Sequence, residues 1–140
     1  MSELNNIALE ILGNGKGILA ADESTATMTK RLEGVNVPST PENRLLFREI
    51  LFSSSSIRDC IGGVILYDET IKQISSKKNK IPELISSMGS HPGIKVDTGA
   101  KVLAGSPEEK ITEGLDGLRE RLKEYNKLGA KFTKWRGVYS

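Results

Sequence analysis

Sulfur, imidazole and aromatic side chains are scarce in this sequence. Its 140 residues include one cysteine, Cys60, and one histidine, His91, and 5% of the residues are aromatic. A lone cysteine excludes an internal disulfide and is typical of a reducing compartment, so we expect a cytoplasmic protein. Because His91 has no second histidine or thiol at ligand spacing, the sequence predicts no metal site.

An excess of one charge and a long apolar segment are also lacking. The chain has 20 Lys and Arg against 18 Asp and Glu, a net charge of +2, so no strong field attracts it to nucleic acid or to a membrane surface. No apolar run approaches the roughly 20 residues that span a bilayer. The N-terminus carries Glu3 and Glu10, where a secretion signal would have a basic start. We therefore expect no nucleic-acid or membrane partner.

Four short apolar runs alternate with helical patterns along the chain. They lie at 18–21, 61–70, 92–99 and 130–139, and the last three are bounded by Gly or Pro and contain β-branched or aromatic residues. Connections this long favour parallel pairing, because a short hairpin would reverse the chain direction. We predict an α/β fold in one domain, residues 1–140, with four parallel strands and connecting helices.

Helical spacing of apolar residues predicts helices at 3–12, 25–34, 39–53, 81–89 and 114–130. The segment 39–53 has the clearest start, because a hydroxyl cap, Ser39 or Thr40, precedes Pro41 in the first turn. The apolar residues that define its pattern are Leu45, Leu46, Ile50 and Leu51.

Charged side chains gather where the predicted strands end. Asp22 follows the first run, Lys95 lies in the third, and Lys134 and Arg136 lie in the fourth. Ligands of parallel α/β folds bind at the carboxyl ends of the strands. Since an unpaired buried ammonium group costs several kcal/mol, each lysine is expected to be ion-paired, solvated in a cavity or functional.

These strand ends together favour a site, although each residue alone is more simply interpreted as a solvated or ion-paired bystander. A cavity lined by all of them would combine a proton-transfer carboxylate with cations suited to a phosphate or a developing oxyanion. An amine crowded by another cation loses its proton more readily and can then form a Schiff base. Spacing alone favours Lys134 as that nucleophile.

Several longer segments, in register along the chain, resemble the class I fructose-bisphosphate aldolases: "GKGILAADEST", "IGGVILYDET", "GIKVDTG", "LAG" and "GLDGLRERLKEYNKLGAKFTKWR". The similarity runs from about residue 5 to the last residues. It implies part of a (β/α)8 TIM barrel and a lyase of glycolysis. That family cleaves fructose bisphosphate to dihydroxyacetone phosphate and glyceraldehyde phosphate through a lysine Schiff base, without a metal or other cofactor.

The resemblance also implies roles for single residues. Asp22 is expected to act in proton transfer, Lys95 to be an active-site lysine, and Lys134 to assist carbinolamine chemistry. The residues expected around the phosphorylated sugar substrate are Ser24, Thr27, Arg31, Trp135 and Arg136. Thr27 stands where many family members have serine and keeps the hydroxyl, whereas Thr98 stands where lysine is usual and loses a charge.

Length is the main departure from the family. A (β/α)8 barrel takes about 250 residues, and these 140 residues end after the fourth predicted strand. The resemblance places the Schiff-base lysine on strand six and paired glutamates on strand five, so it gives Lys134 a supporting role instead. We expect the N-terminal half of an aldolase barrel. Three interpretations stay open: an enzyme completed by a C-terminal companion chain, a non-catalytic remnant, and a half-barrel that associates into a homo-oligomer.

Overall fold

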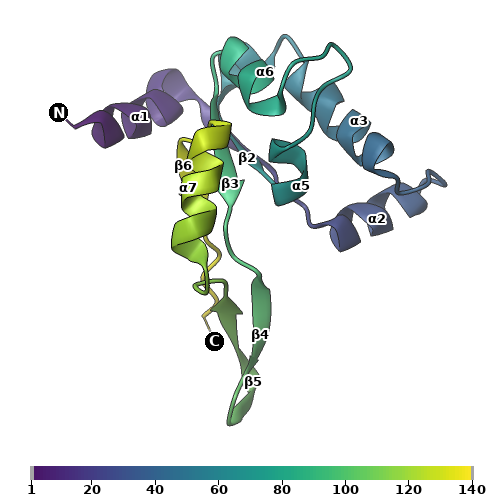
Figure 1. Ribbon diagram of the computed structural model, residues 1–140, viewed down its shortest axis with the longest axis vertical. Helices are drawn as coiled ribbons and strands as arrows, with labels where there is room; N and C mark the ends of the chain where they lie inside the picture. The colour runs from purple at the N-terminus through teal and green to yellow at the C-terminus, as the bar shows by residue number, and fades with distance from the viewer. Residues whose placement is uncertain (1, 140) are drawn as a thin grey trace.

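A four-stranded parallel sheet forms the centre of the computed structural model, which describes residues 2–139 (Figure 1). Its strands are β1 (Gly17–Ala21), β2 (Ile61–Leu66), β3 (His91–Lys95) and β6 (Phe132–Lys134), in that spatial order. All three neighbouring pairs are parallel. The predicted α/β fold with four parallel strands is confirmed, and each predicted apolar run overlaps one of these strands.

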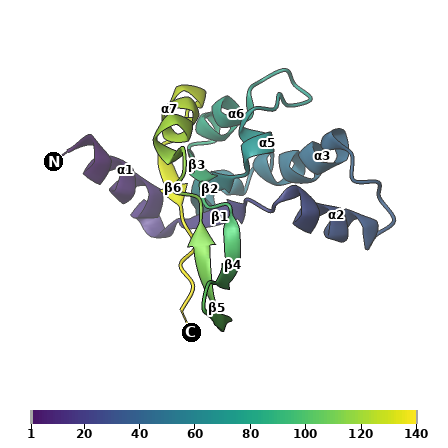
Figure 2. The same cartoon turned by 60° about the horizontal axis from the view of Figure 1, so that its bottom comes forward.

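Helices connect the strands and flank the sheet. They are α1 (Glu3–Leu12), α2 (Thr25–Glu33), α3 (Pro41–Phe52), α4 (Ile57–Cys60), α5 (Asp68–Ile71), α6 (Ile81–Ser87) and α7 (Leu118–Leu128), with one 3-10 turn, η1 (Gly13–Gly15). In both Figure 1 and Figure 2, α1 lies on one side of the strands and α2 and α3 lie on the other. Thr40, and not Ser39, caps α3, because its hydroxyl accepts a hydrogen bond from the Asn43 amide.

The core forms around the two central strands. Val64 and Leu66 of β2 and Ile94 of β3 are fully buried against Phe52 of α3 and Ile85 of α6. Strands of a parallel sheet are covered on both faces, which explains why almost all of β2 is buried. Each of these side chains contributes about 1.5–3 kcal/mol when it is buried, so the cluster holds the ends of the strands in place.

α1 packs against the start of β2 so closely that one position must be glycine. A Cβ atom at Gly62 would lie 1.9 Å from the carbonyl oxygen of Ile11, the buried residue of α1. His91 at the start of β3 adds a polar link, with its Nε2 atom 2.9 Å from the carboxylate of Glu10. These contacts join α1 to both central strands.

α3 has its polar side toward the protein and its apolar side toward solvent. The apolar stripe of a helix normally faces the core, but Leu46 and Ile50 are 54% and 64% exposed. The buried residues of α3 are Arg44, Arg48, Glu49 and Phe52. The helical periodicity at 39–53 was therefore correct, whereas three of the four apolar residues that defined it, Leu46, Ile50 and Leu51, are exposed.

An antiparallel hairpin that the sequence analysis did not predict projects from the sheet, at the bottom of Figure 1. Its strands are β4 (Gly99–Leu103) and β5 (Ser106–Glu113). The guanidinium of Arg121 on α7 holds the base of the hairpin, because it donates hydrogen bonds to the carbonyl oxygens of Val96 and Gly114. Most side chains of β5 are exposed and polar, so no buried apolar run marked it as a strand.

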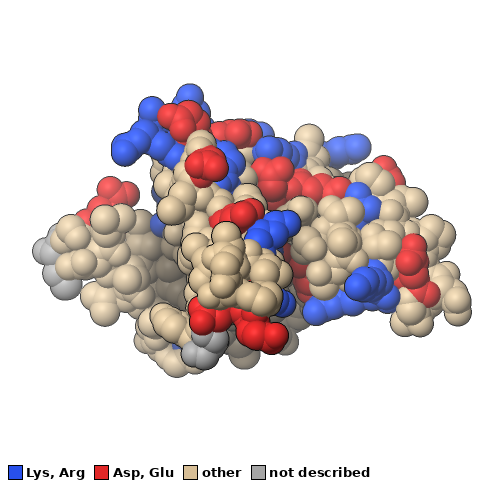
Figure 3. Space-filling view, turned by 90° about the horizontal axis from the view of Figure 1, so that it is seen from below, with Lys and Arg blue, Asp and Glu red and all other residues tan. Residues whose placement is uncertain are grey.

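Acidic and basic side chains are interspersed on the face of the molecule shown in Figure 3, with uncharged areas between them. This mixture agrees with the net charge of +2. Among residues 2–139, no helix has both the length and the apolar character needed to cross a membrane.

Candidate active site

The carboxyl ends of the parallel strands bring the predicted site residues to one edge of the sheet. Lys95 of β3 and Lys134 of β6 are directly paired in register. Asp22 follows β1, whose last residue, Ala21, pairs with Leu66 at the end of β2. Paired residues of neighbouring strands point to the same face, so the two lysines lie side by side at the same level of the sheet.

Asp22 and Lys134 form an ion pair across this edge. The Nζ atom of Lys134 donates to Oδ2 of Asp22 at 2.5 Å, although the two residues are 112 positions apart in the sequence. The Asp22 side chain is 10% exposed and that of Lys134 is 33% exposed. A charge-assisted hydrogen bond at this distance is strong, and one end of it stays open to solvent or to a ligand.

Lys95 lies beside a second buried carboxylate. Its Nζ atom is 3.8 Å from Oδ1 of Asp97, whose side chain is 0% exposed. The Gly99 amide donates to the same oxygen at 3.2 Å. The other oxygen of Asp97 is buried and has no hydrogen-bond partner among the described residues. Lys95 is therefore weakly held compared with Lys134 and keeps donor capacity for a further group.

The segment after Asp22 places two hydroxyls at the start of α2 and an arginine in its last turn. Ser24 caps the helix, because its Oγ atom accepts the Thr27 amide hydrogen at 3.3 Å, and the two hydroxyl oxygens are 3.1 Å apart. Arg31 follows one turn later with a side chain that is 54% exposed, and it forms an ion pair with Glu23. The amino end of a helix carries a partial positive charge, which suits an anionic ligand.

Trp135 and Arg136 lie just beyond β6, and both are exposed. The backbone oxygen of Arg136 accepts a hydrogen bond from Thr112 of the hairpin at 2.7 Å. Within residues 2–139, neither side chain takes part in a hydrogen bond or ion pair. The structure therefore brings Asp22, Lys95 and Lys134 together and leaves these two side chains at the margin.

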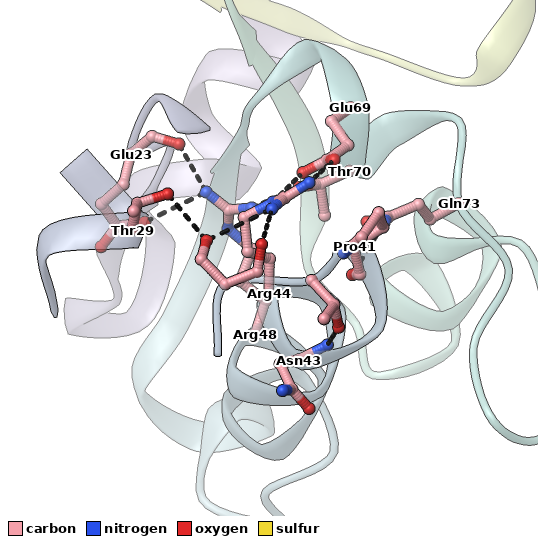
Figure 4. A network of polar contacts seen from close by, with 11 residues as sticks. Glu23, Thr29, Pro41, Asn43, Arg44, Arg48, Glu69, Thr70 and Gln73 are labelled. Carbon is pink, nitrogen blue, oxygen red and sulfur yellow. Dashed lines mark hydrogen bonds and ion pairs between the residues drawn. The ribbon is translucent and has the colours of Figure 1, made fainter. Parts of the chain in front are cut away.

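A buried arginine pair beneath this edge was missed by the sequence analysis (Figure 4). Arg44 donates two hydrogen bonds to the carboxylate of Glu69, at 2.9 and 2.5 Å, and this interaction lowers the pKa of Glu69. Arg48 lies one turn further along α3 and is 1% exposed, and burial lowers its pKa. The spacing of four residues between the arginines, continued by Phe52, is the signal that could have identified this face of α3.

A groove of about 790 Å³ lies away from the charged edge, between α7 and β6. Its apolar lining includes Ile94, Leu118, Leu122 and Phe132. None of the three paired residues Asp22, Lys95 and Lys134 lines it. Because β6 is the last strand of the sheet, the groove runs along an unpaired edge. In the described part of the chain, no cluster of three or more His, Cys, Asp or Glu residues could hold a metal ion.

Known proteins share this arrangement of sequence and fold. The family model for class I fructose-bisphosphate aldolase, a glycolytic family, matches residues 3–140. The probable fructose-bisphosphate aldolase class 1 of Xanthomonas campestris is 49% identical over 138 residues, and the non-muscle fructose-bisphosphate aldolase of Lethenteron camtschaticum is 52% identical over 137 residues. These alignments cover 99% and 97% of this chain but 41% and 38% of the two relatives.

A solved structure agrees over almost the same residues. Fructose-bisphosphate aldolase from Plasmodium falciparum, in a ternary crystal structure with TRAP and a small-molecule inhibitor, matches with a TM-score of 0.93 and 45% sequence identity. The match covers 97% of this chain and 39% of that one. The four parallel strands thus correspond to part of an aldolase TIM barrel, and the chain spans about two fifths of the length of these relatives. On sequence and topology together, it belongs to the class I fructose-bisphosphate aldolase family.

Proposed function

We propose that residues 1–140 supply the first four strands of a cytoplasmic class I fructose-bisphosphate aldolase, together with the proton-transfer and phosphate-binding part of its active site. The reaction is the Schiff-base cleavage of fructose bisphosphate to dihydroxyacetone phosphate and glyceraldehyde phosphate. The observation that carries this proposal is the ion pair between Asp22 and Lys134 at the carboxyl edge of the sheet, with Lys95 paired beside it.

The three catalytic residues have chemically distinct tasks. Asp22 is the proton-transfer carboxylate, and Lys134 holds it in place and faces the reacting oxygen of the carbinolamine. Lys95 is the second cation, and the open geometry around its Nζ atom leaves it able to donate to a substrate oxygen. Pre-placed cations at a developing oxyanion need no reorganisation during the reaction, which is the main source of electrostatic catalysis.

The substrate phosphates are assigned to the margin of the same edge. Ser24, Thr27 and Arg31 offer hydroxyls, the amino end of α2 and a guanidinium within one helix. Arg136 is an exposed guanidinium beyond the end of β6, with the indole of Trp135 next to it in sequence. Arginine binds phosphate through two parallel hydrogen bonds, which makes these two residues the phosphate ligands of choice. No metal is needed for the proposed chemistry.

The Schiff-base lysine is proposed to lie outside residues 1–140, on a later strand of the barrel. Support comes from the edges of the sheet: β1 and β6 each have one neighbour, and an apolar groove borders β6. Unpaired parallel strands and apolar grooves are normally covered. The remaining strands could belong to the same polypeptide or to a companion chain. The same open edges favour the alternative, a half-barrel that pairs with a second copy and has no aldolase activity.

Cleavage of fructose bisphosphate by the complete natural protein that contains residues 1–140 tests this function. Asp22→Asn and Lys134→Met should lower kcat by about 100-fold or more, the usual contribution of a positioned proton-transfer group. Lys131→Met, which removes an exposed lysine just before β6, is the matched control and should keep kcat within about twofold.

Borohydride trapping with dihydroxyacetone phosphate locates the nucleophile. We expect the covalent adduct on a lysine outside residues 1–140, in the same polypeptide or in a companion chain. An adduct on Lys95 or Lys134 would contradict the assigned roles, and a protein that assembles into a homo-oligomer without cleavage or adduct would favour the self-associating half-barrel.

A further inference from the structure

The guanidinium of Arg48 forms hydrogen bonds with residues that follow two neighbouring strands, β1 and β2. Its Nη1 atom donates to the hydroxyl of Thr70, which follows β2, at 2.8 Å, and its Nη2 atom donates to the backbone oxygen of Glu23, which follows β1, at 2.5 Å (Figure 4). The guanidinium is 1% exposed. It therefore fixes the residue directly after Asp22 without reaching the reacting groups itself.

The carboxylate of Glu23 is shared between two arginines of very different exposure. Its Oε1 atom pairs with Arg31, whose side chain is 54% exposed, and its Oε2 atom lies 3.5 Å from Nη2 of Arg48. Oε2 is buried and accepts no hydrogen bond within residues 2–139. The buried arginine thus neutralises Glu23 in part, while the exposed arginine completes the neutralisation.

A buried arginine lowers the stability of a fold unless its interactions compensate for the loss of hydration. Removing a cation of this size from water costs several kcal/mol, and the Nε atom of Arg48 has no hydrogen-bond partner among the described residues. Phe52, one turn further along the same side of α3, is fully buried, so this side of the helix also packs an apolar side chain. Packing alone would favour a residue such as Met at position 48, so the charge itself needs an explanation.

We propose that Arg48 is a positioning residue that sets how tightly Glu23 holds Arg31, and thereby how readily Arg31 binds a substrate phosphate. A phosphate must compete with Glu23 for the guanidinium of Arg31. Arg48 weakens this competition, because its positive charge offsets part of the negative potential that the carboxylate of Glu23 creates at Arg31. This inference rests on the proposed function, in which Arg31 is a phosphate ligand.

Phosphate affinity in a set of variants tests this coupling. The probe is inorganic phosphate, titrated calorimetrically into the complete natural protein that contains residues 1–140. Arg48→Met should weaken binding by about tenfold, in the range found for neighbouring coupled charges, and Glu23→Gln should tighten it. In the Glu23→Gln background, Arg48→Met should change the dissociation constant by less than about twofold, because the competing charge is already gone.

The matched control is Arg44→Met, which removes a second buried arginine from the same face of α3. Arg44 pairs with Glu69 and has no bond to Glu23, so this variant should lose stability and keep its phosphate affinity within about twofold. Arg48→Lys retains the charge next to Glu23 and should recover most of the affinity that Arg48→Met loses. If the role of Arg48 were purely structural, Arg48→Met and Arg44→Met would weaken phosphate binding equally. Arg48→Met would then also weaken it as much in the Glu23→Gln background as in the natural protein.

Three results would overturn the inference about Arg48. Equal losses in both backgrounds, or phosphate affinity that is unchanged in Glu23→Gln, would overturn the inference, and the second comparison holds even if Arg48→Met fails to fold. Phosphate affinity that is insensitive to Arg31→Gln would overturn it as well. Cleavage activity is measured separately. A protein that shows the expected phosphate affinities but no cleavage supports the inference and refutes the proposed function. A protein that cleaves fructose bisphosphate but lacks the expected affinities supports the proposed function and refutes the inference.

Discussion

Replacing Lys134 by methionine should lower the free energy of unfolding by about 2 kcal/mol. The change leaves the carboxylate of Asp22, whose side chain is 10% exposed, without the ammonium group that lies 2.5 Å away. A hydrogen bond to a charged group contributes about 1.5–3 kcal/mol. Because Lys134 is 33% exposed, solvent screens part of the interaction, and a value in the lower half of that range is expected.

A double-mutant cycle isolates the pair from the rest of the substitution. Urea unfolding of the natural protein is compared for Lys134→Met, Asp22→Asn and the combined variant, since urea leaves the ionic strength unchanged. The coupling energy should be about 1–2 kcal/mol. The control cycle uses Lys80 and Glu83, which are 3.5 Å apart with side chains 66% and 64% exposed, and its coupling should stay below about 0.5 kcal/mol.

Salt provides a second check on the same pair. Exposed charges are screened within about 10 Å at 0.1 M salt, whereas partly buried pairs are screened much less. The coupling between Asp22 and Lys134 should therefore survive 0.5 M sodium chloride. A coupling energy near zero, or one that salt removes as it does for the control pair, would refute the conclusion that this ion pair stabilises the position of β1 relative to β6.

Two further predictions concern the close contact between Gly62 and Ile11 and the ion pair between Arg44 and Glu69. Gly62→Ala should cost more than about 2 kcal/mol, because the new Cβ would lie 1.9 Å from the Ile11 carbonyl oxygen, whereas Gly13→Ala meets no atom within 4 Å and should be nearly neutral; thermal unfolding compares them. The hydrogen bond from Arg44 lowers the pKa of Glu69, so its stabilisation should be complete above the unfolded value of about 4.5 and be lost as the pH falls through the lower folded-state pKa. Urea unfolding between pH 3 and 6 checks this, and an identical pH dependence in Arg44→Met would contradict it.

Buried strands and capped helices could be predicted because their signals are local. The central strand β2 is apolar where the structure buries it, and Thr40 with Pro41 marked the start of α3. The run 18–21 does form β1, but only Ala21 of it is buried, so its apolar character predicted the strand and overstated its burial. The hairpin from Gly99 to Glu113 gave no such signal, since its residues are mostly exposed and its pairing depends on a turn at Gly105, where φ is 82°. A sequence pattern reveals burial more readily than it reveals pairing at the surface.

The composition of the candidate site could be predicted in part. Parallel topology alone places Asp22, Lys95 and Lys134 at one edge, because the carboxyl ends of parallel strands coincide. Direct contact between residues 112 positions apart depends on the register of all four strands and on β6 in particular, which no local pattern contains. Arg48 was missed for a different reason: a charged residue among leucines is normally assigned to the solvent side of a helix.

The inverted orientation of α3 and the open edges of the sheet have a common explanation in the proposed barrel. The inward side of α3 carries the arginines that hold the strand ends, so its apolar residues are left outside, and Ile50 is 64% exposed. At the two edges of the sheet, Ile18 of β1 is 45% exposed and β6 borders the apolar groove. Isolated apolar side chains on a surface are ordinary, but apolar area at both ends of a parallel sheet and on an adjoining helix is not. Closure into an eight-stranded barrel would pair both edges and surround the sheet with a complete ring of helices. In the proposed enzyme, the same closure would bring a lysine from a later strand to the edge where Asp22 and Lys134 lie, so the same strands would complete both the proposed fold and the proposed chemistry.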